Sequence, residues 1–211
     1  DGKYMRVHRS IYSSRSDIKM MNTRLENKLT NILEPLATMA HSLGFEYYAG
    51  FIEDIWKLLL KNHAHDSIGC CCSDKVMREI KMRFELAEEK IDRMIDYYKR
   101  KITDAIPCDQ GLDKVVAFNM LPYSRETVIR TQIITRMKDF CLVDENRKIY
   151  NYQIIEAQEI DPGLVDRQIV HYGNYDPFIC YTIEFYANLP AMGYKTFLIQ
   201  NGKHNEKNKQ E

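Results

Sequence analysis

One short segment of this chain gathers several side chains that could bind a metal ion. Within ten residues it holds two histidines, an aspartate and three consecutive cysteines: His63, His65, Asp66, Cys70, Cys71 and Cys72. Imidazole nitrogens, carboxylate oxygens and thiolates are the protein ligands of zinc. The segment Asn62–Asp66, at the end of an apolar run, is therefore the first candidate for the chemistry of this chain.

The two histidines are unequal candidates. On a continuous helix, side chains two residues apart point about 200° apart, so His63 and His65 could share one ion only from a loop. A lone histidine is more often a helix cap or a hydrogen-bonded core residue than a ligand. Asp66 changes this balance for His65, because a carboxylate can orient an imidazole or contact the same ligand. We favour His65 with Asp66, although one histidine and one aspartate do not complete a metal site.

The cysteines do not follow the spacing of a zinc motif such as paired CxxC. Cysteine is among the most buried residue types, so packing is favoured over a soft metal site of Cys70–Cys72 with a histidine. Adjacent cysteines also rarely suit disulfide geometry. Since the start of the sequence does not have the plan of a secretory leader, we expect reduced thiols in the cytoplasm.

Two further segments carry residues suited to polar ligands. Near the start, three arginines lie close to two tyrosines, and composition alone favours a solvated segment over an anion or sugar strip; they are Arg6, Arg9, Arg15, Tyr4 and Tyr12. The segment Asp161–Pro177 mixes acidic and aromatic residues. A loop of this kind suits carbohydrate contact and docking against another domain equally, so both remain open.

Composition limits the class of partner. The 211 residues hold 30 basic and 30 acidic side chains, so the net charge is zero. This argues against nucleic acid or a membrane surface as the main partner. No apolar run approaches the roughly 20 residues of a membrane-spanning helix.

The elements that must position the candidate segment are helical. Apolar residues recur every three or four positions over 17–43, 50–61 and 74–106, with the candidate segment in the loop after the second run. The predicted inward positions of the first helix are Ile18, Met21, Leu25, Leu29, Ile32, Leu36, Met39 and Leu43. Pro35 should kink or split this helix. Residues 16–107 are thus predicted to form a three-helix bundle.

Near residue 107 the pattern changes to short, β-rich runs. Strands are predicted at 114–118, 126–135, 140–143, 148–155, 178–187 and 194–200, with a hairpin turn at 144–147. Strands without intervening helices predict an antiparallel sheet or partial sandwich over 112–200, and so an α+β fold. The polar residues 201–211 are expected to be a disordered tail or linker.

The candidate segment resembles a known family. The run LLLKNHAHDSIG at 58–69 is similar to the middle-domain motif of glycoside hydrolase family 38, the α-mannosidases. Ser13-Ser14-Arg15 before the long helix resembles the exit from the catalytic barrel of that family, which would make residues 1–15 this exit segment. The runs AFNMLP at 117–122 and LPAMGY at 189–194 resemble the start of its β-sandwich region. The motifs stand in the order of the family along nearly the whole chain.

The resemblance implies roles for two residues. The family is a group of metal-dependent retaining glycosidases, in which barrel residues and the histidine of this motif hold zinc or a similar divalent ion. Carried over by position, His65 is the metal ligand and Asp66 contacts a sugar hydroxyl. Ala64 stands where many relatives have a second histidine, so no role passes to His63. The resemblance places no catalytic residue in this chain.

The same resemblance implies that the chain is the middle of a longer protein. The nucleophile, the acid/base and the other ligands are expected on a barrel before Asp1, and more of the β domain after Glu211. The partners would be an α-mannoside and these missing parts; self-association is left open. The runs 62–76 and 161–178 are most similar to the bacterial branch that hydrolyses 2-O-mannosylglycerate and its 6-phospho form. The chain alone is expected to be inactive and to bind metal weakly or not at all.

Two other functions remain open on the residues alone. The chain could be a non-catalytic helical interaction module in which the histidine and cysteine loop only packs. It could also be a metal-binding module that uses Cys70–Cys72 with a histidine.

Overall fold

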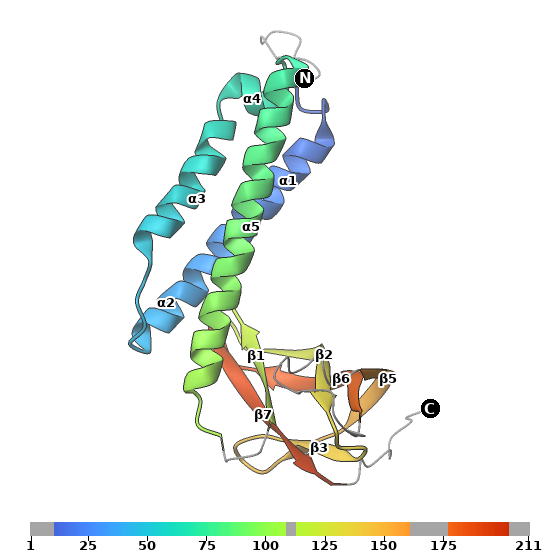
Figure 1. Cartoon of the computed structure of the whole chain (residues 1–211). Coiled ribbons are helices and arrows are strands. Elements are labelled where there is room, and N and C mark those ends of the chain that lie inside the picture. The colour runs from blue at the N-terminus through green and yellow to red at the C-terminus, as the bar shows by residue number, and fades with distance from the viewer. Residues whose placement is uncertain (1–10, 109–112, 161–176, 203–211) are drawn as a thin grey trace, which may run out of the picture. The chain divides into compact units, whose positions relative to one another are not determined.

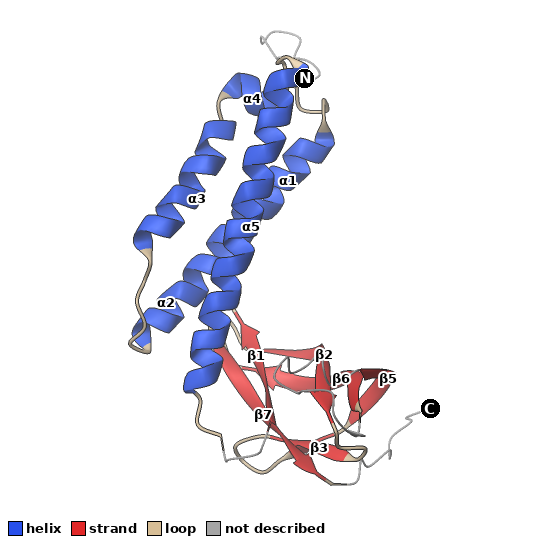
Figure 2. Ribbon diagram, viewed as in Figure 1, coloured by secondary structure: helices blue, strands red, loops and turns tan. Residues whose placement is uncertain are grey.

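The computed structural model describes residues 11–108, 113–160 and 177–202. Most of the predicted exit segment 1–15, most of the tail 201–211 and all but the last residue of the Asp161–Pro177 loop lie outside these residues. The chain divides into two compact units, residues 1–105 and 106–211. The first is helical and the second is built of antiparallel strands (Figure 2). The α+β fold class is therefore confirmed.

The helical unit begins with one unbroken helical stretch. It consists of α1 (Ser16–Lys28), a π-helical turn η1 (Leu29–Leu33) and α2 (Glu34–Ser42). Helices α3 (Ala49–Asn62), α4 (His65–Gly69) and α5 (Asp74–Ala105) follow (Figure 1). Gly44 ends the first stretch with a φ of 92°, a left-handed conformation that glycine adopts without strain.

The described residues of this unit contain one helix more than the predicted three. Helix α4 lies in the segment that was predicted to be a loop, and it starts where the N–H groups of Ser67 and Ile68 donate to the Ala64 carbonyl. Five residues are too few for a 3.6-residue period to show in the sequence. The bundle prediction is therefore right in its three long elements and wrong at this connection.

The π turn changes which face of the first stretch is buried. The N–H of Glu34 donates to the carbonyl of Leu29, five residues back, so the turn holds one residue more than an α-helical turn. Leu33 is consequently fully buried, whereas Ile32, which was predicted to point inward, is 37% exposed. Pro35 follows in the first turn of α2, where its missing N–H is best tolerated.

Polar contacts tie the helices together around this core. Lys28 on α1 pairs with Asp92 of α5 at 2.6 Å, and Arg24 pairs with Glu88 at 2.8 Å. The indole N–H of Trp56 on α3 donates to Glu34 of α2 at 2.7 Å. The buried side chains of α5 are Met77, Ile80, Phe84, Ala87, Ile91, Ile95, Tyr98 and Ile102.

The β unit contains two antiparallel sheets. The first has the order β1-β7-β3-β4 and the second β2-β6-β5. The strands are β1 (Asp113–Asn119), β2 (Arg125–Thr135), β3 (Phe140–Val143), β4 (Ile149–Tyr150), β5 (Tyr152–Ile160), β6 (Phe178–Leu189) and β7 (Gly193–Asn201). Aromatic rings from both sheets meet in the core, with Phe185 and Phe197 centred 4.8 Å apart.

One predicted strand is two strands in the structure. Residues 148–155 divide at Asn151 into β4, which pairs with β3, and β5, which pairs with β6. Tyr150 and Tyr152 are both buried in the core, so the two-residue alternation continues through the point where the chain changes sheet. The sequence pattern alone therefore could not show the division.

Within the described residues, no helix is long and apolar enough to cross a membrane.

Candidate functional site

The candidate segment forms a tight connection between α3 and α4. His63 follows the last residue of α3 with helical angles, and Ala64 then turns to an extended conformation (φ −50°, ψ 132°). His65 is the first residue of α4. The connection lies at the same end of the helical unit as the start of α1 (Figure 1).

His65 and Asp66 form an exposed pair. The imidazole Nε2 lies 3.2 Å from Asp66 Oδ1, and the two side chains are 94% and 69% exposed. Asp66 Oδ1 also accepts a hydrogen bond from the Cys71 thiol at 3.4 Å. This bond, together with desolvation and the carboxylate charge, raises the pKa of Cys71. A nitrogen and an oxygen donor are thus held side by side, open to a ligand from outside the unit.

His63 has a different environment. Its Nε2 lies 2.7 Å from Asn22 Oδ1 and 3.4 Å from Glu26 Oε1, both on α1. The side chain therefore connects the end of α3 to α1. The structure does not bring His63 into the pair formed by His65 and Asp66.

Asn62 is an anchor that the sequence reasoning missed. The side chain is fully buried; its amide donates to the Ile80 carbonyl at 3.0 Å, and its oxygen accepts from Arg83 Nε at 2.6 Å. Both partners lie on α5. The signal was present, because Asn62 continues the inward spacing of Ile52, Ile55 and Leu59 along α3.

The far end of α4 is held by the segment before α1. Ser14 Oγ donates to the Gly69 carbonyl at 3.0 Å, and Lys19 Nζ lies 3.6 Å from Cys70 Sγ. A Cβ on Gly69 would stand 3.3 Å from Ile11 Cγ2, so a side chain there would press on this segment. Residues 55 positions apart in sequence thus fix this short helix.

The three cysteines do not gather as ligands. Cys71 is exposed and Cys70 and Cys72 are half-buried, and none of the six cysteines forms a disulfide. Cys70 ends α4 with a left-handed φ of 60°. Across the described residues, no group of three or more His, Cys, Asp or Glu side chains is arranged to hold a metal ion.

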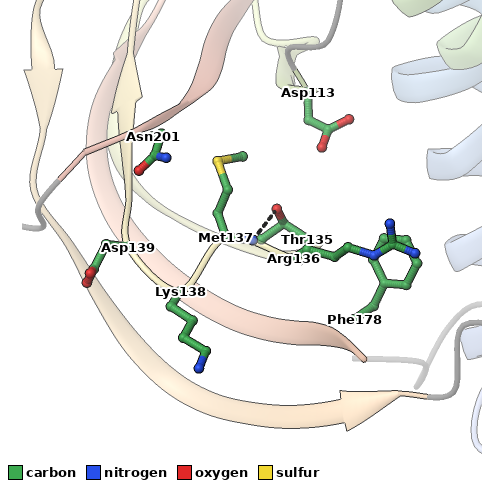
Figure 3. A pocket seen from close by; sticks show the side chains of 8 residues that line it. All are labelled: Asp113, Thr135, Arg136, Met137, Lys138, Asp139, Phe178 and Asn201. Atoms are coloured by element: carbon green, nitrogen blue, oxygen red, sulfur yellow. Dashed lines mark hydrogen bonds between the residues drawn. The ribbon is translucent and has the colours of Figure 1, made fainter. Parts of the chain in front are cut away.

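The β unit contains a hollow. It has a volume of about 560 Å³ and is lined by Asp113, Thr135, Arg136, Met137, Lys138, Asp139, Phe178 and Asn201 (Figure 3). The Arg136 guanidinium stands 4.4 Å from the Phe178 ring centre, which covers a face of that ring. Two acidic and two basic side chains balance one another in the lining, so the hollow favours no single class of ligand.

Comparison with known proteins shows which family the sequence resembles. The sequence profile described as "Alpha mannosidase middle domain" matches residues 6–102, which include the whole candidate segment. This chain is similar to the α-mannosidases of glycoside hydrolase family 38. The match covers most of the helical unit, as the motif at 58–69 indicated.

Individual relatives agree with this assignment. A "Putative mannosylglycerate hydrolase" of Halalkalibacterium halodurans is 43% identical over 116 residues, or 55% of this chain and 11% of that protein. Human "Alpha-mannosidase 2C1" is 27% identical over 128 residues, which is 60% of the chain and 12% of the relative. The chain thus spans about a tenth of the length of these curated relatives.

The solved structures show the same fold. A crystal structure of an α-mannosidase from Enterococcus faecalis V583 matches 95% of this chain and 25% of its own, with a TM-score of 0.73 and 23% identity. The likeness covers the β unit as well as the middle domain.

The residues present fit one edge of a metal site. Imidazole nitrogen and carboxylate oxygen are suitable zinc ligands, and the His65 ring is exposed rather than committed to the core. Two donors are fewer than the three or four protein ligands that zinc sites use. The middle domain could therefore hold such an ion only together with ligands from elsewhere.

Proposed function

We propose that the protein containing this chain is a glycosidase that hydrolyses α-mannosides, with His65 as a metal ligand and Asp66 as a sugar-hydroxyl contact. The observation that carries the proposal is the exposed His65–Asp66 pair, 3.2 Å apart, at an end of the α-mannosidase middle domain. A divalent ion held there, with zinc as the first choice, would bind and polarise sugar hydroxyls.

In the proposed reaction, this chain supplies a metal ligand and a sugar contact but not the two catalytic carboxylates. The imidazole of His65 supplies one donor, and the Asp66 carboxylate accepts a hydrogen bond from a mannose hydroxyl. A retaining glycosidase needs two carboxylates about 5 Å apart at the scissile bond. Among the described residues Asp66 contacts His65 and Cys71 and not another acid, so we assign the nucleophile and the acid/base to other parts of the protein.

The proposed substrate is 2-O-mannosylglycerate or its 6-phospho form. The support is that the "Putative mannosylglycerate hydrolase" of Halalkalibacterium halodurans is more similar to this chain than the human α-mannosidase is. Hydrolysis of mannosylglycerate, its phosphorylated form and an aryl α-mannoside by the complete protein would rank these substrates. A higher kcat/KM for the aryl mannoside would overturn the narrower proposal and leave the family activity standing.

We also propose a cytoplasmic location. The support is that none of the six cysteines forms a disulfide, although Cys71 is exposed, which suits a reducing compartment.

The test of the metal role is His65→Ala in the complete protein. We expect zinc affinity and kcat/KM toward α-mannosides to fall more than about 100-fold, because a direct ligand is lost. His41→Ala is the matched control, since His41 is an exposed histidine of the same unit whose contacts are the Phe45 carbonyl and the edge of the Tyr47 ring. Unchanged zinc content and turnover in His65→Ala would refute the proposal.

A further inference from the structure

The side chains of His65 and Asp66 are too exposed to be held in place by packing around them. We propose that Asn62 is the positioning residue of this pair: by fixing the end of α3 on α5, it fixes where the imidazole and carboxylate stand. The inference rests on the proposed function, because it concerns the geometry of that metal and sugar site.

The contacts of Asn62 are directional. Nδ2 donates to the Ile80 carbonyl and Oδ1 accepts from Arg83 Nε, so one side chain binds two points almost one helical turn apart on α5. An apolar side chain at this position would fill the same space beside Leu59 and Ile55. The amide adds two bonds of fixed length and direction, and these set the rotation and height of the last turn of α3 against α5.

The segment that joins Asn62 to His65 is short, so a shift of one residue moves the other. Two residues separate them, and each Cα step is about 3.8 Å. The first of these residues, His63, is itself tied to Asn22 on α1 at 2.7 Å. The end of α3 is thus bound to both of its neighbours just before the chain turns at Ala64 and starts α4.

The opposite end of α4 is bound as well. Ser14 donates to the Gly69 carbonyl, and Lys19 contacts the Cys70 sulfur. The two exposed side chains therefore stand on a short helix that is held at both ends by hydrogen bonds. Asn62 itself is fully buried, so its amide is satisfied by its two contacts on α5.

The test measures zinc affinity of the complete protein with Asn62→Leu and Asn62→Asp. Removal of both bonds in Asn62→Leu is expected to weaken zinc binding about 10- to 100-fold, the range for residues that orient a metal ligand. Asn62→Asp keeps the acceptor for Arg83 and should recover part of this loss. Since the site is displaced and not deleted, excess zinc should restore most of kcat in both variants.

The matched control is Trp56→Phe. It removes one side-chain hydrogen bond from the same helix, to Glu34, six residues before Asn62. A lower Tm with unchanged zinc affinity is expected for this variant. Zinc affinity in Asn62→Leu equal to that of the unaltered protein, with the fold shown intact by circular dichroism, would overturn the inference.

Two further variants keep the outcomes distinct. In a His65→Ala background, Asn62→Leu should add nothing to the loss of zinc binding, because the two residues act through one another. If His65→Ala binds zinc normally, the proposed function itself fails. Should Asn62→Leu not fold, Arg83→Met, which leaves the bond to Ile80, is expected to weaken zinc binding by a smaller factor, and no change there would refute the role of the pair.

Discussion

One carboxylate oxygen of Asp66, Oδ1, lies close to both an imidazole and a thiol. His65 Nε2 and the Cys71 thiol both lie within 3.4 Å of Oδ1. The thiol donates to the carboxylate, and a thiolate there would face a negative charge, so the pKa of Cys71 is raised. The cysteine therefore reports on the carboxylate that is proposed to contact the sugar.

Replacement of the Asp66 carboxylate should make the Cys71 thiol easier to deprotonate. In Asp66→Asn the charge and its strong acceptor are gone, so the pKa of Cys71 should fall and alkylation should start at lower pH, because the thiolate is the reactive form. The measurement is the pH profile of iodoacetamide labelling, followed on the Cys71 peptide by mass spectrometry. Cys141, whose thiol donates to the Gln200 carbonyl at 3.6 Å, serves as the internal control. An unmoved Cys71 profile would show that the contact with Asp66 is not formed in solution.

Asp144 is a buried carboxylate of the β unit, and we expect its protonation to lower the stability of that unit. Burial acts to raise the pKa of Asp144, but hydrogen bonds from the Lys148 and Asn146 N–H groups, the Tyr150 hydroxyl and Lys195 outweigh it and lower the pKa below 3.8. A group with a lowered folded pKa stabilises the fold above its unfolded pKa, and this contribution is lost as the pH falls through the folded value.

The free energy of unfolding should therefore decrease as the pH falls below about 4. Asp144→Asn should cost about 1–3 kcal/mol at pH 7, because Lys195 and Tyr150 lose a charged partner, and it should flatten the acid slope. Urea unfolding followed by tyrosine fluorescence at several pH values measures both effects. The exposed carboxylate of Glu126 offers the control, Glu126→Gln, and an equal acid slope in Asp144→Asn would contradict the assignment.

At the scale of the element, the π turn η1 decides which side chains enter the helical core. Leu33 is fully buried and Ile32 is 37% exposed. We expect Leu33→Ala to cost about 2–5 kcal/mol of unfolding free energy, and Ile32→Ala less than half as much, because only the first leaves a cavity. Urea unfolding followed by circular dichroism at 222 nm compares the two variants. The reverse order would mean that α1 and α2 form a regular α-helix without η1.

The same turn shows where sequence reasoning reaches its limit. The spacing predicts the inward positions Ile18, Leu25, Leu29 and Leu36 correctly, and it fails at Ile32 and Leu43, which are exposed. The extra residue of the π turn buries Leu33 in place of Ile32. The pattern contains no sign of that insertion apart from Pro35. Similarly, the alternation that predicted a strand at 148–155 was correct for the buried faces and could not show a change of sheet.

The candidate pair was predictable because its members are adjacent in sequence. A carboxylate next to an imidazole needs no tertiary contact to meet it, so His65 and Asp66 could be selected from the chain alone. The anchors that fix them could not be selected in this way. Ser14 meets Gly69 across 55 residues, and Asn62 meets Arg83 only when α3 packs on α5. Their roles as ligand and sugar contact remain predictions.

At the scale of the whole molecule, the two units carry different kinds of information. The family profile matches residues 6–102, within the helical unit, and that unit contains the His65–Asp66 pair. The β unit has its own aromatic core and a hollow whose described lining has two acidic and two basic side chains and favours no single ligand. The proposed chemistry of the chain thus depends on one exposed edge of one unit.

The 211 residues alone should therefore bind zinc poorly and turn over no α-mannoside. Their described part offers no group of three ligands, and a retaining glycosidase needs a second carboxylate about 5 Å from the first. We expect zinc affinity more than about 100-fold weaker than that of the complete protein, because His65 would be the one proposed ligand left to the ion. Competition titration against a zinc dye and an aryl mannoside assay measure the two properties. Stoichiometric zinc that disappears in a Cys70–Cys72 serine variant would instead favour a cysteine metal site, and turnover by the isolated chain would overturn the placement of the catalytic carboxylates outside it.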